Sequence, residues 1–159
     1  SATPVQLARS FGGLALKGPI PVPHVVLASE LPKIGRSLPA PLKQSPPFNP
    51  KFVKIISRGL WGVVNEYGTG RRAAVKGFDV CGKTGTAQVV SRETQLRNES
   101  DKKFEDNAWF VGFAPRDFPE ITAAVFVEQG GHGGTSAAPI IREMFQVYFD
   151  KYKTLHSEN

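Results

Sequence analysis

Residues 82–86 of this 159-residue chain read Gly-Lys-Thr-Gly-Thr, and their side chains and spacing suit acyl-transfer chemistry. Lys83 supplies a cation that can hold a carboxylate and favour proton movement. Thr84 and Thr86 offer hydroxyls to the same carboxylate, and the N–H groups of a strand can bind a developing oxyanion. Gly85 has no side chain, so a substrate backbone can lie against it. The segment is therefore a candidate site for a carboxylate-bearing substrate.

The same lysine completes a phosphate-loop pattern, Gly-x4-Gly-Lys-Thr, over residues 77–84. Such a loop follows a buried strand and opens a helix whose free N–H groups face the phosphates. Residues 70–76 are too polar for a buried parallel strand, and Gly85 is a poor residue for a first helical turn. Asp79 would also place a negative charge inside the loop. The sequence therefore favours a strand at Lys83, with a nucleotide-binding protein as an alternative of a different class.

Four stretches place the triplet in a wider pattern of fixed order and spacing. They read Ala-Thr-Pro-Val-Gln-Leu-Ala-Arg at 2–9, Cys-Gly-Lys-Thr-Gly-Thr-Ala-Gln at 81–88, Asp-Asn-Ala-Trp-Phe-Val-Gly-Phe-Ala-Pro at 106–115 and Glu-Gln-Gly-Gly-His-Gly-Gly at 128–134. Through them the chain resembles, over nearly its whole length, the C-terminal part of the transpeptidase domain of class B penicillin-binding proteins, most closely the elongation-type enzymes. The resemblance implies an α+β fold, an antiparallel sheet with packed helices that is part of a penicillin-binding/β-lactamase-like domain.

The resemblance also implies an activity, that of a peptidoglycan D,D-transpeptidase acting in cell-wall synthesis and cell shape. A serine is acylated by a D-Ala-D-Ala stem peptide or by a β-lactam, and the acyl group of the peptide passes to an amine. Lys83 would serve proton transfer, whereas Thr84, Gly85 and Thr86 would bind substrate, with the Thr86 N–H in the oxyanion hole. No metal or cofactor is implied. A D,D-carboxypeptidase, a β-lactamase-like relative and a non-catalytic antibiotic sensor remain alternatives.

The nucleophile of this family is not found where the resemblance requires it. Family members carry Ser-x-x-Lys and Ser-x-Asn before Lys-Thr-Gly, but the literal matches here begin at Ser100 and Ser157, after it. The first lies in a charged stretch and the second at the chain end, so both are interpreted as accidental. Residues 1–159 are therefore expected to be the C-terminal segment of a single transpeptidase domain. The serine would belong to a missing segment, which would also be the partner of this chain.

Composition limits which further partners the chain can have, and the resemblance implies where the parent protein is located. An apolar content of 40% suits one modest core. The net charge of +6 would permit a nucleic-acid partner, but lysine and arginine are interspersed with acidic residues, so no nucleic acid is expected. The chain has no run of eighteen apolar residues. By resemblance, the parent is anchored in the cytoplasmic membrane with this domain on the periplasmic or extracellular side, and a membrane glycan polymerase is a further candidate partner.

Local patterns predict three helices. Thr3, Pro4 and Gln6 form the capping box of the first, whose expected apolar face is Val5, Ala8, Phe11 and Leu14 or Ala15. The second begins at Asn49-Pro50, ends before Gly68 and has an apolar face expected in the core: Phe52, Val53, Ile56, Leu60, Val63 and Val64. The third follows the glycines at 130–134. Residues 19–50 hold nine of the thirteen prolines, so loops and a hairpin are expected there.

Three strands are expected near residues 80–91, 107–114 and 120–128, the last two as a hairpin, with residues 91–105 as a polar link. The triplet would then lie on an edge strand. Cys81 could be read as a nucleophile, but no His or Asn lies near it in sequence, so a buried strand residue is favoured. His132 is interpreted as part of a strand-to-helix turn rather than a base, and Trp109 and Phe110 as core residues.

Overall fold

The computed structural model describes residues 2–18, 20, 22–25, 29–37, 47–89 and 105–157. Its α-helices are α1 (Pro4–Ala15), α2 (Pro50–Asn65) and α4 (Ala137–Ser157), and its strands are β1 (Cys81–Ala87), β2 (Asn107–Ala114) and β3 (Ile121–Val127). Two short 3-10 helices, η1 (Pro32–Ile34) and η2 (Arg71–Ala73), complete the regular elements of the described ranges. The predicted α+β class is confirmed.

The three strands form one antiparallel sheet in the order β1-β2-β3. The turn between β2 and β3 confirms the predicted hairpin, and β1 is an edge strand of this sheet, as expected for the strand with the triplet. Strand β1 ends at Ala87 because its partner residue, Asn107, is the first of β2. The predicted continuation through Gln88 and Val89 is therefore wrong. The polar link lies outside the described residues except for Glu105.

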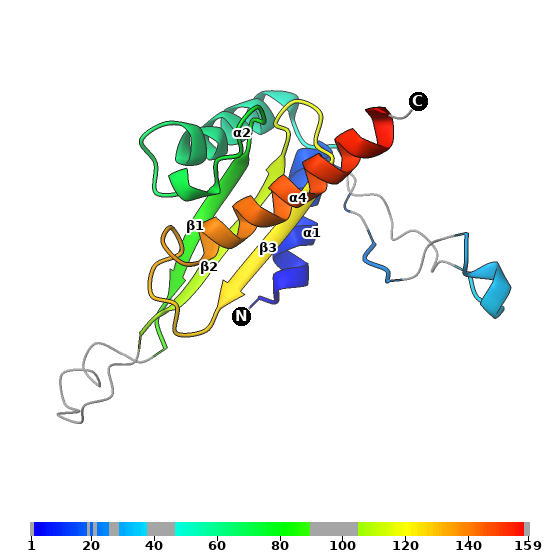
Figure 1. The fold of residues 1–159 in the computed structure, drawn as a ribbon, viewed down its shortest axis with the longest axis horizontal. Coiled ribbons are helices and arrows are strands. Elements are labelled where there is room, and N and C mark those ends of the chain that lie inside the picture. The colour runs from blue at the N-terminus through cyan, green and yellow to red at the C-terminus, as the bar shows by residue number, and fades with distance from the viewer. Residues whose placement is uncertain are drawn as a thin grey trace.

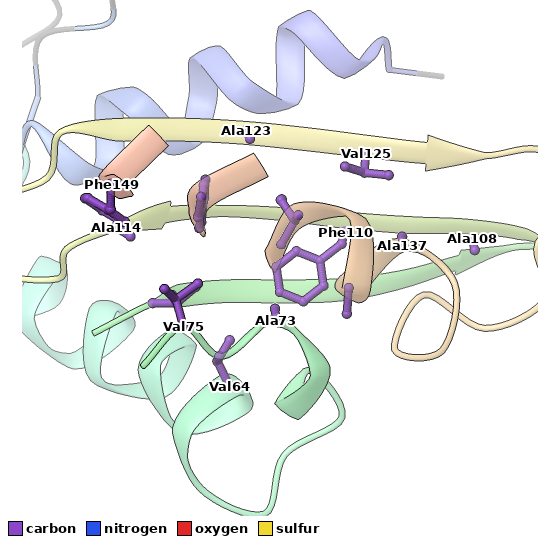
Figure 2. Packing of buried hydrophobic residues seen from close by; sticks show 14 residues of the cluster. Val64, Ala73, Val75, Ala108, Phe110, Ala114, Ala123, Val125, Ala137 and Phe149 are labelled. Atoms are coloured by element: carbon purple, nitrogen blue, oxygen red, sulfur yellow. The ribbon is translucent and has the colours of Figure 1, made fainter. Parts of the chain in front are cut away.

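Helices cover both faces of the sheet. Figure 1 shows α4 in front of the strands and α1 behind them. The α4 side holds the larger core, whose fully buried side chains include Phe110, Ile141 and Phe145. Figure 2 shows the side chains of this cluster between the strands and the helices. The α1 side holds a smaller cluster of Ala15, Cys81 and Phe113. Alternation along β2 explains this division, since successive side chains point to opposite faces.

Helix α1 begins with the predicted capping box. The Thr3 hydroxyl accepts a hydrogen bond from the Gln6 N–H at 3.2 Å, and the Gln6 side chain accepts one from the Thr3 N–H at 2.8 Å. The expected apolar face is partly wrong, because Val5 is 58% exposed. Burial is concentrated near the end of the helix, at Gly12, Gly13 and Ala15, and Ala15 packs with Cys81 and Phe113 of the sheet.

Helix α2 lies along β1 and is less buried than its periodicity predicts. Val53 and Val64 are buried, but Phe52 is 64% exposed, Ile55 68% and Ile56 47%. The core role expected for Phe52 and Ile56 is therefore wrong within the described part of the chain. The helix presents one side to β1 and η2, and its exposed large apolar side chains all lie in its first half.

The proline-rich segment contains η1 as its only regular element within the described residues between 20 and 49. The hairpin predicted there is not seen in that part, and residues 19, 21, 26–28 and 38–46 lie outside the description. Proline fixes one backbone angle and removes an N–H donor, which explains why the described part of this segment forms no longer helix. None of the described helices combines the length and the apolar character needed to cross a membrane.

Candidate active site

The Lys83 ammonium is folded back onto its own strand. Its Nζ donates to the Thr84 carbonyl oxygen at 2.8 Å and lies 3.4 Å from Thr84 Oγ1. Lys83 and Thr84 project from opposite faces of β1, so the two groups can meet only around the outer edge of the strand. The candidate site is therefore an edge cluster, with a cation, a carbonyl and a hydroxyl within hydrogen-bonding reach.

The outer edge also presents backbone donors. Because the Thr84 carbonyl accepts from the lysine ammonium, it faces away from β2. Backbone groups alternate between the two edges of a strand, so the N–H of Thr86 faces the same outer edge. The Thr86 side chain is exposed. An N–H and a hydroxyl from Thr86 thus lie one strand repeat beyond the Lys83–Thr84 pair.

Thr69 belongs to this cluster, although the sequence patterns did not indicate it. Its hydroxyl oxygen lies 2.8 Å from the Thr84 hydroxyl oxygen. Thr69 comes from the turn between α2 and η2, fifteen residues before its partner. A single threonine in a polar turn does not indicate a functional site in the sequence. Thr69 reaches the site only because β1 runs past this turn in the folded chain.

The two glycines of β1 are explained by aromatic neighbours on β2. A Cβ at Gly82 would overlap the Phe110 ring, which lies on the α4 side of the sheet. A Cβ at Gly85 would lie 3.1 Å from Trp109 Cβ on the other side. Phe110 is fully buried, which confirms its predicted core role, whereas Trp109 is only partly buried and contacts Phe126 in a tilted arrangement with 4.6 Å between ring centroids.

The glycine-rich connection from β3 to α4 crosses the sheet at the triplet. A Cβ at Gly133 would overlap the Trp109 carbonyl oxygen and lie 2.6 Å from the Gly85 carbonyl oxygen. A Cβ at Gly134 would overlap the Thr69 carbonyl oxygen and lie 3.7 Å from Thr84 Cγ2. The two glycines therefore let this connection lie directly on the backbone that carries the candidate site.

His132 lies in this connection with its side chain exposed, as predicted for a turn residue. Its carbonyl oxygen accepts from the Thr135 N–H at 3.0 Å and the Ser136 N–H at 3.1 Å, which fixes the turn that leads into α4. The part of the chain that the structure describes contains no group of three or more His, Cys, Asp or Glu side chains able to hold a metal ion. The polar groups of the candidate site are the lysine ammonium, threonine hydroxyls and backbone groups.

Residues 77–84 do not form a phosphate loop. The chain continues from Cys81 to Ala87 as a strand, so no helix starts at Lys83. Asp79 accepts a hydrogen bond from Trp61 Nε1 at 2.7 Å, which ties its carboxylate to α2. The literal Ser-x-x-Lys match at Ser100 lies outside the described residues, as do the last two residues of the Ser157 match.

Cys81 is fully buried, which confirms its reading as a strand residue. Burial raises the pKa of its thiol from 9.0 to about 12, because the thiolate would lose its hydration. We expect Cys81 in the folded parent protein to resist iodoacetamide at pH 8 and to react after unfolding in urea, as mass spectrometry of its peptide would show. The contribution of this thiol to stability should be lost as the pH rises from 9 towards 12. Rapid labelling of the folded protein would contradict the burial.

The edge strand carries Lys-Thr-Gly and belongs to an antiparallel sheet covered by helices. Comparison with known proteins shows which protein family has this arrangement. Residues 1–146 match the penicillin binding protein transpeptidase domain, and the chain belongs to this family. It is 35% identical over 158 residues to the peptidoglycan D,D-transpeptidase MrdA of Haemophilus influenzae and 37% identical over 158 residues to MrdA of Acinetobacter baumannii. The predicted family, of the elongation type, is confirmed.

A solved structure agrees with the sequence relatives. The crystal structure of Pseudomonas aeruginosa PBP2 in complex with WCK 5153 superimposes with a TM-score of 0.70 at 31% identity, covering 92% of this chain and 29% of that one. The two MrdA alignments cover 95% and 93% of this chain but 24% and 22% of the relatives. The chain thus spans about a quarter of the length of the curated relatives that it matches.

Proposed function

We propose that this chain is the C-terminal segment of a single transpeptidase domain whose parent protein is a peptidoglycan D,D-transpeptidase. The observation that carries the proposal is the Lys83–Thr84 cluster on the outer edge of β1, in a chain of the transpeptidase family. The nucleophilic serine would belong to the missing segment of the domain. That segment would form the other wall of a cleft along β1.

In the proposed reaction, the serine oxygen attacks the carbonyl carbon between the two D-alanines of a stem peptide. The bond to the terminal D-alanine breaks, its nitrogen takes a proton, and the remaining peptide is held as an ester. An amine of a neighbouring strand then attacks the ester carbonyl, its nitrogen forms the cross-linking amide bond and loses a proton, and the ester bond breaks as the serine oxygen takes up a proton. A β-lactam would acylate the same serine by opening its ring.

The described geometry supports a role for each member of the edge cluster. Lys83 would stabilise charge and assist proton movement, because its ammonium lies at the edge where substrate would arrive. Thr84 and Thr86 would hold the substrate carboxylate, and the outward N–H of Thr86 would stabilise the oxyanion. Gly85 would allow the substrate backbone to approach the strand closely. These roles need no metal or cofactor.

The proposed partners are peptidoglycan stem peptides, β-lactams and the missing segment of the same domain, with a membrane glycan polymerase as a further candidate. We place the parent at the cytoplasmic membrane, with this domain on the periplasmic or extracellular side. The family and the names of the relatives, peptidoglycan D,D-transpeptidases, support these assignments.

The test is to label the complete gene product with a fluorescent penicillin and to map the labelled peptide by mass spectrometry. We expect the label on a serine that precedes Ser1 in the parent sequence. Well-folded wild-type protein without label would contradict the proposal. Incubation with a stem peptide and an acceptor amine then separates the related activities, because a transpeptidase forms the cross-link, a carboxypeptidase releases the hydrolysed peptide, and a sensor stays acylated.

A further inference from the structure

We infer that Thr69 positions the Thr84 hydroxyl so that its hydrogen points towards a substrate carboxylate. The inference rests on the proposed function, in which Thr84 holds that carboxylate. The hydroxyl oxygens of Thr69 and Thr84 are 2.8 Å apart. Thr69 would contact Thr84 and not the reacting atoms, so it is a positioning residue.

The argument follows from the donors and acceptors around Thr84 Oγ1. A hydroxyl has one hydrogen to donate and two lone pairs that accept. The Lys83 ammonium can only donate, and its Nζ lies 3.4 Å from this oxygen. When the Thr69 hydroxyl donates to the same oxygen, both lone pairs are engaged. The hydrogen of Thr84 is then left to donate to a further group, and an anionic carboxylate requires a donor.

Thr69 can direct this hydrogen only if its own backbone is held, and two neighbouring segments hold it. Gly70, the next residue, donates its N–H to the Val63 carbonyl in α2 at 2.9 Å. Gly134, before α4, lies so close to the Thr69 carbonyl oxygen that a Cβ would overlap it. The turn is thus fixed from α2 on one side and from the β3–α4 connection on the other.

The experiment measures the second-order rate constant for acylation of the complete parent protein by benzylpenicillin, which carries a carboxylate. Thr69→Val keeps the shape of the side chain and removes the hydroxyl, and we expect it to lower the rate constant about 3- to 10-fold, the range for loss of one hydrogen bond. Thr69→Ser keeps the hydroxyl and should restore most of the rate. In a Thr84→Val background, Thr69→Val should cause no further loss, because the group through which it acts is gone.

Three results would overturn the inference without touching the proposed function. An unchanged rate in Thr69→Val would show that the hydroxyl does not matter. An equal loss in the Thr84→Val background, or a loss that Thr69→Ser fails to restore, would show a general structural role. Wild-type protein that is folded but not acylated would instead overturn the proposed function, and this inference with it. Circular dichroism melting of each variant identifies any loss caused by unfolding.

Discussion

Replacement of Lys83 by alanine is expected to lower the rate of penicillin acylation of the parent protein by about 100- to 10,000-fold, the range for loss of a group that assists proton transfer. The ammonium lies at the outer edge of β1, 2.8 Å from the Thr84 carbonyl oxygen. Its removal takes away the positive charge proposed to balance the substrate carboxylate and to help move the proton of the serine. Stopped-flow or gel measurement of fluorescent penicillin labelling gives the rate.

Lys76→Ala is the matched control for this prediction. Lys76 is exposed in the turn between Val75 and Phe78, so its removal changes the net charge equally without touching the edge cluster. We expect its acylation rate to equal that of wild type. A Lys83→Ala protein that is labelled as fast as Lys76→Ala would exclude the proposed role of Lys83.

Gly133→Ala is expected to destabilise the domain by about 3 kcal/mol, at the upper end of the cost of inserting a methylene into a packed site. The new Cβ would overlap the Trp109 carbonyl oxygen and lie 2.6 Å from that of Gly85. These oxygens belong to the ladder between β1 and β2, so relief requires movement of main chain rather than of a flexible side chain. Thermal or urea unfolding of the parent protein, followed by circular dichroism, measures the loss.

Gly59→Ala should change the stability of the domain in the opposite direction. Gly59 lies within α2, and a Cβ there would meet no atom within 4 Å. Alanine is favoured over glycine inside a helix by about 0.5–1 kcal/mol, so this variant should be slightly more stable than wild type. Equal unfolding midpoints for Gly133→Ala and Gly59→Ala would show that the β3–α4 connection does not press on the sheet.

Local sequence patterns predicted much of the fold, because the interactions that form these elements join residues close together in the sequence. The capping box at Thr3 and Gln6 needs only the first turn of α1, and the hairpin of β2 and β3 needs only its own short connection. The strand at Lys83 followed from the same kind of evidence, since Gly85 argues against a helix. The end of β1 at Ala87 could not be predicted from local patterns, because it depends on where the partner strand begins.

The remaining parts depend on contacts between segments that are distant in sequence. Periodicity identified the apolar face of α2, but it cannot say what covers that face, and Phe52 and Ile56 are exposed. The approach of Thr69 to Thr84 and of Gly133 to Gly85 requires the tertiary path of the whole chain. Part of the candidate site was thus visible in one motif, whereas the residues that support the motif were not.

The position of Lys83 has a further consequence for the solubility of the domain. An edge strand exposes unpaired backbone groups that can template pairing with another chain, and proteins often block such edges with lysine. Here the ammonium occupies the Thr84 carbonyl, one of the groups that an incoming strand would need. A neutral replacement would leave that carbonyl open. One side chain thus supplies the charge for the proposed chemistry and also protects the same edge from aggregation.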